Sequence, residues 1–349
     1  MDEEAVEVDH SVTSMQEGHE ATCWGCGLRL LLTAYAPVFK CGWCGAITQQ
    51  NQTSRKPDSV CFSHWRCVRD RSLVAILLFF MFFVISGGVW AVYPVVFSIS
   101  YFCGVFHCIV TAILSIITIS SFFLASFSSA GAPTNILWGS YPVVGKNGLE
   151  NYTFCTYCTK PKPPRAHHCR SCKMCVMDMD HHCPFIGNCV GAANHRFFVA
   201  FLISIVISCS YILVMTIYAG FRVWPPLKLR TLVAYGLNST SALSLVKEIT
   251  AAFASSAFLL SARGLLLVYL AFASLSVEIG ISVLLWQQLS FIYEGNTYIN
   301  SVTSPNAVHG ERGWQNILRF FGCPHSVFRI LLGPTNGGKS QNNSNSKLL

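Results

Sequence analysis

Four long runs of uncharged, apolar residues constrain the fold of this chain more than any other feature. A helix needs about 20 apolar residues to cross the hydrocarbon core of a bilayer, and each run reaches that length: residues 73–93, 102–127, 197–221 and 265–289. Apolar residues make up 52% of the chain and charged residues 11%, whereas about a quarter of the residues in soluble proteins are charged. We therefore expect an all-α integral membrane protein with four transmembrane helices.

Three features near these runs refine that expectation. Pro94 follows the first run and is expected to end its helix, because proline lacks the N–H that a helix interior requires. Residues 249–262 are apolar but short for a span, and Arg263 separates them from the fourth run, so we interpret them as an interfacial helix. Glu278 lies near the middle of the fourth run, where a charge is costly, and we expect it to hydrogen-bond to a neighbour inside the bundle.

The distribution of basic residues predicts the orientation of the spans. Four spans leave both tails and the loop between the second and third runs on one side, and 19 of the 24 Lys and Arg residues fall there. The positive-inside rule assigns that side to the cytosol. Asn238-Ser239-Thr240, on the opposite side, matches the glycosylation acceptor pattern of a lumenal loop. The net charge of +8 suits an anionic membrane surface, and no basic stretch interleaved with aromatic residues indicates nucleic acid.

The seventeen cysteines predict metal sites more than disulfides. The chain starts with acidic residues, not with the basic and then apolar pattern of a signal peptide. Most of the cysteines occur in Cys-x2-Cys pairs or near histidine. This usage is typical of zinc sites in a reducing compartment.

Residues 21–50 contain the first cysteine module. Cys23 and Cys26 form one pair and Cys41 and Cys44 form the other, each in a turn rich in Trp and Gly. Four thiolates in two such turns suit a tetrahedral structural zinc. The pattern favours a small zinc ribbon that serves as a rigid or protein-binding element. A nucleic-acid-binding finger is the weaker alternative, because only Arg29 and Lys40 lie inside the module.

The second module holds more zinc donors than two zinc ions can use. Seven cysteines and four histidines occur between residues 155 and 189, and two closed tetrahedral sites take eight ligands. Spacing alone leaves open which three are unused. A thiolate that is free of metal but close to zinc, histidine and basic groups would be a nucleophile. Two structural zincs with no chemistry are the alternative.

The spacing in this module resembles that of the DHHC-type protein S-acyltransferases (palmitoyltransferases). The pattern Cys-x2-Cys-x9-His-Cys-x2-Cys-x2-Cys-x4-Asp-His-His-Cys-x5-Cys runs without a gap from Cys155 to Cys189. Members of that family carry this domain in a cytosolic loop between the second and third of four spans, which is the topology expected here. The N-terminal ribbon lies outside the core pattern of the family.

The resemblance implies a role for every donor in this module except His167. Cys183 is the family's nucleophile, His181 its base, and Asp180 the group that orients His181. One zinc would be held by Cys155, Cys158, His168 and Cys175, and the other by Cys169, Cys172, His182 and Cys189. The resemblance also implies an acyl-CoA such as palmitoyl-CoA as co-substrate, with Lys162 and Arg165 facing the CoA. The partners would be membrane-associated substrate proteins.

The resulting organisation has six parts. These are a disordered acidic N-tail (1–20), the zinc ribbon (21–50), helices 1 and 2 (73–127), the cytosolic cysteine-rich catalytic domain (128–196), helices 3 and 4 with a lumenal loop (197–289), and a cytosolic C-terminal tail (290–349). A Golgi, endosomal or plasma membrane location fits equally well. A membrane-anchored zinc scaffold without catalysis is the alternative function, and it would need no free thiol at Cys183.

The sequence departs from the family in two places. The family's Asp-Pro-Gly after the second span is reduced to a Gly and a Pro within Ser129–Pro133. Its Thr-Thr-x-Glu after the fourth span is replaced by Thr297, Tyr298 and Asn300. The second Thr normally supports the active-site Asp, and we expect the hydroxyl of Tyr298 to support Asp180 instead. Asn316 matches the family's C-terminal motif.

Overall fold

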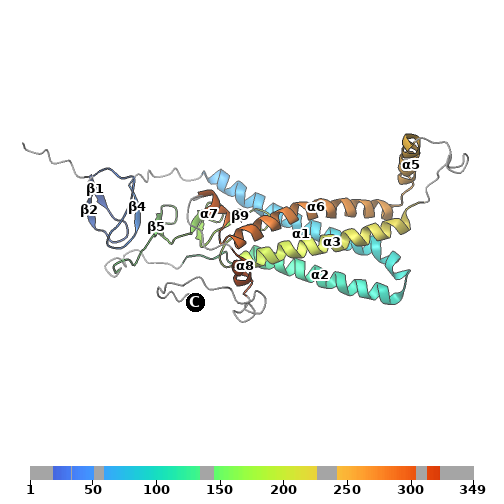
Figure 1. Ribbon diagram of the computed structural model, residues 1–349, viewed down its shortest axis with the longest axis horizontal. Coiled ribbons are helices and arrows are strands. Elements are labelled where there is room, and N and C mark those ends of the chain that lie inside the picture. The colour runs from blue at the N-terminus through green and yellow to red at the C-terminus, as the bar shows by residue number, and fades with distance from the viewer. Residues whose placement is uncertain are drawn as a thin grey trace, which may run out of the picture. The chain divides into compact units, whose positions relative to one another are not determined.

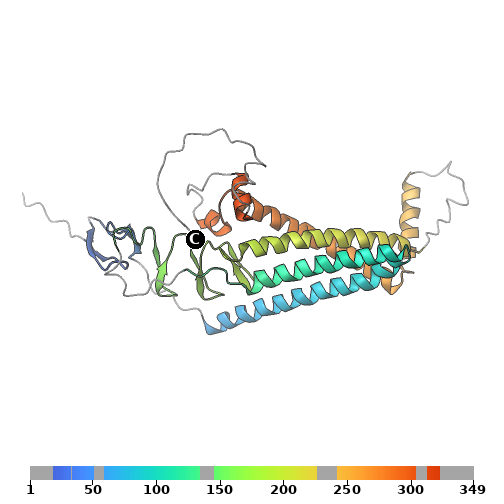
Figure 2. The same cartoon turned by 90° about the horizontal axis from the view of Figure 1, so that it is seen from below.

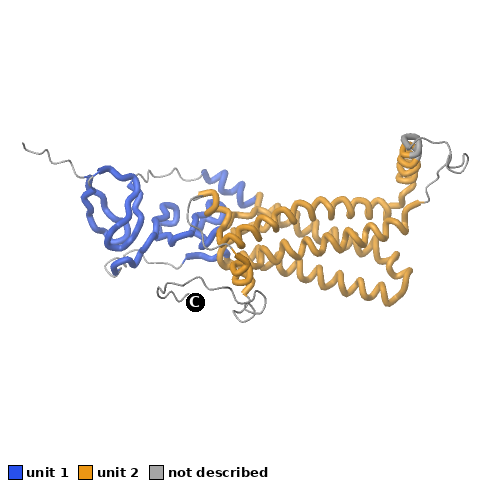
Figure 3. The backbone as a smooth tube through the Cα atoms, viewed as in Figure 1, with its two compact units in different colours: residues 1–68, 130–179 blue, residues 69–129, 180–349 orange. Residues whose placement is uncertain are grey.

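A computed structural model describes residues 19–32, 34–50, 59–133, 145–225, 242–303 and 313–322. The chain divides into two compact units, which are coloured separately in Figure 3. Unit 1 comprises residues 1–68 and 130–179, and unit 2 comprises residues 69–129 and 180–349. The acceptor pattern at Asn238, nearly all of the acidic N-tail and most of the C-terminal tail lie outside the described residues.

Unit 2 is built on a bundle of long apolar helices (Figure 1). Four helices are long and apolar enough to cross a membrane: α1 (Val60–Phe97), α2 (Tyr101–Phe127), α3 (His195–Val223) and α6 (Ala262–Tyr293). They confirm the four predicted spans. Helix α3 packs against both α2 and α6, and Figure 2 shows the four helices side by side from a second direction. Many large apolar side chains on their outer faces are exposed, as expected of helices surrounded by lipid.

Helix α1 differs from its prediction at both ends. It begins at Val60, so the polar and basic residues before the apolar run are also helical. The prediction that Pro94 ends the helix is wrong, because Pro94 lies inside α1 and the helix continues to Phe97. One turn is possible beyond a proline since its own missing N–H affects only the preceding turn, and the Ser98 N–H still reaches the Pro94 carbonyl at 3.3 Å.

Small polar side chains join the helices inside the bundle. Thr118 of α2 lies 3.0 Å from Ser208 of α3, measured between their hydroxyl oxygens. The Ser210 hydroxyl of α3 donates to the Glu278 carboxyl of α6 at 2.5 Å, which confirms that Glu278 hydrogen-bonds to a neighbour. Such contacts help to hold membrane helices together, because no hydrophobic effect drives helices to associate within lipid.

Short helices complete unit 2. Helix α5 (Ala242–Ala257) lies outside the four candidate spans and covers most of the segment interpreted as an interfacial helix, but begins and ends earlier than predicted. The indole of Trp224, just after α3, donates to the Ser256 hydroxyl of α5 at 3.0 Å. Helices α7 (Tyr298–Thr303) and α8 (Trp314–Phe320) follow α6. The Asn316 side chain donates to the Tyr293 carbonyl at 3.0 Å and ties α8 to the end of α6.

All the described strands form two-stranded antiparallel hairpins. Unit 1 holds four of them: β1 (His19–Thr22) with β2 (Arg29–Leu32), β3 (Val38–Lys40) with β4 (Ile47–Gln49), β5 (Thr153–Cys155) with β6 (Lys160–Lys162), and β7 (His167–Cys169) with β8 (Met174–Val176). Unit 2 holds β9 (His181–Cys183) with β10 (Asn188–Val190). Hairpins this small bury little apolar surface, so they need metal ions or neighbours for stability.

Candidate active site

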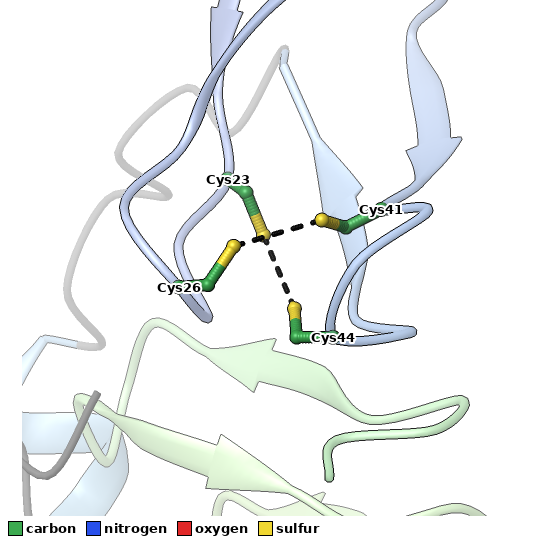
Figure 4. A group of neighbouring side chains, drawn as sticks. All are labelled: Cys23, Cys26, Cys41 and Cys44. Carbon is green, nitrogen blue, oxygen red and sulfur yellow. Dashed lines mark hydrogen bonds between the residues drawn. The ribbon is translucent and has the colours of Figure 1, made fainter. Parts of the chain in front are cut away.

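The four cysteines of the N-terminal module converge on one point, as Figure 4 shows. The sulfur atoms of Cys23, Cys26, Cys41 and Cys44 lie within 4.8 Å of one another. Each Cys-x2-Cys pair sits in a turn whose next residue, Gly27 or Gly45, has a left-handed φ of 73° or 78°. Four converging sulfur donors fit a tetrahedral zinc ion.

A second group of donors lies at the hairpins β5–β6 and β7–β8. The donor atoms of Cys155, Cys158, His168 and Cys175 also lie within 4.8 Å of one another. His168 and Cys175 face each other across the hairpin, and the His168 Nδ1 atom lies 3.2 Å from the Cys158 sulfur. A hydrogen bond with Cys175 is the main reason that the pKa of Cys155 falls to about 5. A thiolate is the form that binds zinc.

The remaining predicted zinc ligands fall in two pairs. Cys169 and Cys172 belong to unit 1 and share one turn, in which the Cys172 N–H donates to the Cys169 sulfur at 3.4 Å. His182 and Cys189 belong to unit 2 and face each other across β9 and β10. The His182 Nδ1 atom lies 3.6 Å from the Cys189 sulfur.

The three hairpins between residues 153 and 190 share one sequence pattern. Cys155, Cys169 and Cys183 end the first strand of their hairpins at equal intervals along the chain. A residue with positive φ follows each turn: Thr159, Lys173 and Gly187. The first two turns carry a second cysteine, Cys158 or Cys172. The third turn carries Ile186 at that place, so Cys183 has no partner thiol within its own turn.

Strand β9 presents its three side chains to opposite sides. Successive side chains of a strand alternate between its two faces, so His181 and Cys183 share one face and His182 takes the other. This alternation separates two histidines of the same chemistry. His182 pairs with Cys189 across its hairpin, as His168 pairs with Cys175 across the preceding one. His181 lies beside the Cys183 thiol.

Asp180, His181 and Cys183 form a chain of hydrogen-bonded groups. The His181 Nδ1 atom lies 2.7 Å from an Asp180 carboxylate oxygen. Burial alone would lower the pKa of His181, but hydrogen bonds with Asp180 and Cys183 raise it to about 9. Burial alone would raise the pKa of the Cys183 thiol, but hydrogen bonds from His181 and from backbone N–H groups lower it. The arrangement favours a thiolate beside an imidazolium.

Asp180 is fully buried and is held by groups far away in the sequence. The Gln288 side chain of α6 donates to one carboxylate oxygen at 3.0 Å. The backbone N–H of Tyr298 donates to the other at 2.7 Å. The prediction that the Tyr298 hydroxyl would support Asp180 is therefore wrong in its atom, because the support comes from the main chain. These donors and His181 lower the pKa of Asp180, although burial alone would raise it.

Gln288 is itself oriented by a second buried side chain. Its carbonyl oxygen lies 2.8 Å from the His195 Nε2 atom. Because the amide nitrogen of Gln288 donates to the Asp180 carboxylate, its oxygen must accept a hydrogen bond from the His195 Nε2–H group. The His195 side chain is itself buried at the start of α3.

Asn188 and Asn194 attach the β9–β10 hairpin to the ends of two helices. The Asn188 amide donates to the Ser128 carbonyl at 2.8 Å, just beyond the end of α2. The Asn194 amide, immediately before α3, donates to the Ala125 carbonyl at 3.1 Å and to the Cys189 carbonyl at 2.8 Å. The bonds to Ala125 and Ser128 satisfy carbonyls at and just beyond the end of α2 that have no partner within the helix. They also fix Cys183 at the end of the bundle.

An apolar cavity of about 430 Å³ runs from Cys183 into the helix bundle. All four long helices contribute to its wall, which includes Leu77, Met81, Leu114, Phe201, Ile281 and Leu284. Its size falls in the range of ordinary small-molecule sites. A long apolar chain attached at Cys183 would therefore have a place among the helices.

The second part of the chain matches a known family. Residues 149–305 match the DHHC palmitoyltransferase model. Curated relatives with similar segments include the Mus musculus palmitoyltransferase ZDHHC15, which is 42% identical over 80 residues, 23% of either chain. The Drosophila melanogaster palmitoyltransferase Hip14 is 44% identical over 66 residues, 19% of this chain and 10% of that protein. The chain thus matches less than a quarter of the length of these relatives.

The two predicted CoA-binding residues lie in different settings within the region that matches the DHHC palmitoyltransferase model. Lys162 ends strand β6 and is half-buried. Arg165 forms an ion pair with Asp178 at 2.7 Å, with about half of each side chain exposed. A CoA phosphate would have to displace Asp178 from Arg165. The contact of these residues with CoA stays a prediction.

Sequence reasoning missed three residues that hold the candidate site in place. Gln288 and His195 hold Asp180 as described above. Asp70 of α1 lies 3.0 Å from the His182 Nε2 atom. A polar residue inside a predicted span was a usable signal for Gln288, whereas nothing local marks Asp70 or His195.

Proposed function

We propose that this protein is an S-acyltransferase that moves a long-chain acyl group from acyl-CoA to cysteine thiols of substrate proteins. The observation that carries the proposal is the position of Cys183. Its thiol lies next to His181, whose ring contacts the fully buried Asp180, and lines the apolar cavity of the helix bundle. The match of residues 149–305 to the DHHC palmitoyltransferase family supports the same activity.

The reaction has two steps that return the site to its starting state. The Cys183 thiolate attacks the carbonyl carbon of the acyl-CoA thioester, and CoA leaves as a thiolate that takes the proton of His181. A substrate cysteine thiol then gives its proton to His181 and attacks the acyl group on Cys183. The Cys183 thiolate is released, and His181 is again protonated. Asp180 orients the His181 ring and stabilises its protonated form throughout.

The cavity gives the acyl chain a binding site of its own. Each buried CH2 group contributes roughly 0.8 kcal/mol, so a long chain gains far more than a short one. The apolar wall also excludes water from the Cys183 thioester. Exclusion of water would slow its hydrolysis and leave transfer to a substrate thiol as the main outcome.

The metal sites would keep this geometry rigid. We propose that Cys169, Cys172, His182 and Cys189 hold one zinc ion, and that Cys155, Cys158, His168 and Cys175 hold another. Zinc at these closed sites supplies structural cross-links and leaves no open position for water. His182 would then fix the backbone next to Cys183 without taking part in the chemistry.

The charge distribution and the apolar helices support a proposal for where the reaction takes place and which substrates reach the site. The excess of Lys and Arg on the side of the tails and the DHHC domain supports a cytosolic site. Substrates would be membrane-associated proteins with a cysteine close to the cytosolic surface. Acyl-CoA would reach Cys183 with its CoA moiety in the cytosol and its chain among the helices.

The test is acyl transfer to Cys183 in the purified full-length protein. We expect covalent uptake of label from a fluorescent or alkyne-tagged palmitoyl-CoA, and we expect hydroxylamine to release it as a thioester. Cys183→Ser should abolish uptake while the zinc content stays that of the parent. Cys209→Ser is the matched control, because Cys209 also lines the cavity but lies inside α3, away from His181. Equal labelling of parent and Cys183→Ser would favour a zinc scaffold and reject the mechanism.

A further inference from the structure

The N-terminal ribbon shares its backbone hydrogen bonds with the segment that leads into the DHHC domain. The N–H groups of Asn147, Leu149 and Asn151 donate to the carbonyls of residues 43, 44 and 45 at 2.9, 2.9 and 3.0 Å. In the other direction, the Ile47 N–H donates to the Tyr152 carbonyl at 2.8 Å. The second cysteine turn of the ribbon therefore lies along residues 147–152, both within unit 1.

Leu149 also completes the small core of the ribbon. Its side chain is only 1% exposed and packs with Cys23, Cys41, Cys44 and Ala46. A module of this size has almost no apolar core of its own. The residue that fills its centre comes from a segment more than a hundred positions later in the chain.

Trp24 extends the contact to the strand that carries the first zinc ligand of the DHHC domain. Its indole N–H donates to the Ile47 carbonyl at 2.9 Å. Its ring lies 5.5 Å from the ring of Phe154, which directly precedes Cys155 in β5. The ribbon thus contacts the neighbour of a ligand in the next metal site.

We propose that the ribbon metal site is a structural part of the DHHC domain. Metal at Cys23, Cys26, Cys41 and Cys44 holds residues 147–154 in place. Those residues in turn hold Cys155 at its metal site, so the two sites retain zinc cooperatively. The ribbon is then an internal support for the second site and not an independently tethered module. The proposal concerns zinc retention and stands whether or not the protein transfers acyl groups.

Two glycines offer a matched pair of variants. Gly27 and Gly45 follow the second cysteine of their turns and have nearly the same left-handed φ, 73° and 78°. Each donates its N–H to the first cysteine of its turn at 3.0 Å. A Cβ on Gly27 would have nothing within 4 Å, whereas a Cβ on Gly45 would lie 2.9 Å from the Glu150 Cα. The two alanine variants therefore carry similar backbone strain, and only Gly45→Ala pushes the 147–152 segment away.

The measurement is site-resolved cysteine alkylation of the zinc-loaded, full-length protein. A zinc chelator and a maleimide are added together, and mass spectrometry follows the labelling of Cys155 and Cys158. Loss of two or three backbone hydrogen bonds corresponds to about a tenfold effect or more. We expect Gly45→Ala to speed labelling of these two cysteines by about tenfold over Gly27→Ala. Amide hydrogen exchange at Leu149 and Asn151 should rise in the same variant.

A second pair replaces one tryptophan in each metal-binding turn and leaves all four cysteines in place. Trp24→Ala removes the ring beside Phe154. Trp43→Ala removes a ring of the same size that is 52% exposed and serves as its control. Faster labelling of Cys155 in Trp24→Ala alone supports the proposal. Equal labelling within both pairs of variants would overturn it and leave the ribbon an independent module.

Discussion

The carboxylate of Asp70 lies 3.0 Å from the Nε2 atom of His182, although 111 residues separate the two in sequence. A carboxylate only accepts, so Nε2 carries the proton and the lone pair of Nδ1 faces the Cys189 sulfur. Arg69 donates to the other Asp70 oxygen at 2.7 and 2.9 Å. The first membrane helix thus sets the tautomer and direction of a predicted zinc ligand.

Replacement of Asp70 should weaken zinc binding without touching a ligand. Loss of such an outer partner typically lowers metal affinity about 10- to 100-fold. We expect Asp70→Ala to lose zinc to a chelator faster than the parent, as followed with a colorimetric zinc indicator. Asp178→Ala is the control, because its ion pair with Arg165 is about half exposed and contributes little. Identical zinc loss in the two variants would contradict the assigned role of Asp70.

The two adjacent histidines should fail in different ways. His181→Ala removes the proposed base and should slow acyl-enzyme formation about 10²- to 10⁴-fold with unchanged zinc content. His182→Ala removes a zinc donor and should lower the zinc content together with thermal stability. Zinc per chain and acyl labelling, measured on the same preparations, separate the two outcomes. A zinc-depleted His181→Ala protein would mean that the roles of the two residues are exchanged.

Gln288 should act on the reaction through Asp180. Its hydrogen bond goes to a buried charged group, and such bonds contribute about 1.5–3 kcal/mol. Gln288→Met keeps the volume but removes the donor, so we expect acyl-enzyme formation to fall about 10- to 100-fold. The pKa of His181 should also fall, because a less firmly held Asp180 stabilises the imidazolium less.

Gln287→Met is the matched control for Gln288. Gln287 is the preceding residue on the same helix, but its side chain is exposed. Its variant should keep the parent rate of acylation and the parent pH profile. If both variants behave alike, the bond between Gln288 and Asp180 has no role in positioning.

The reactivity of Cys183 should depend only weakly on pH in the neutral range. Its lowered pKa keeps the thiolate populated as the pH falls, while His181 keeps its proton up to about pH 9. An ordinary thiol, with a pKa of about 8.5, loses reactivity tenfold per pH unit below that value. Alkylation of Cys183 by iodoacetamide should therefore fall less steeply between about pH 9 and about pH 7 than that of an ordinary thiol. The steep dependence of an ordinary thiol should return in His181→Ala, and its presence in the parent would rule out the ion pair.

Local patterns predict the parts of this structure that depend on neighbouring residues. The length of each apolar run predicts a membrane span, and the Cys-x2-Cys spacing predicts the metal-binding turns. The support of the site lies beyond such reasoning because it joins distant segments. Asp180 accepts hydrogen bonds from the Gln288 side chain near the end of α6 and from the Tyr298 N–H at the start of α7. A backbone donor cannot be recognised from the type of residue that carries it. The sequence did not predict that α1 begins at Val60 and includes Asp70, because the residues before the apolar run are polar and basic.

The repeated hairpins place Cys183, the proposed nucleophile, in a turn of the kind that carries metal ligands in the other two hairpins. The backbone N–H groups of Tyr157 and Cys158 lower the pKa of Cys155, and those of Phe185 and Ile186 do the same for Cys183. What distinguishes the third turn is Ile186, an apolar side chain at the place of a second thiol. A reactive thiolate thus arises from a structural one by the loss of a single neighbour. Because Cys183 lies in such a turn, we expect its thiolate to bind thiophilic ions such as cadmium or mercury. These soft metals should therefore inhibit the protein.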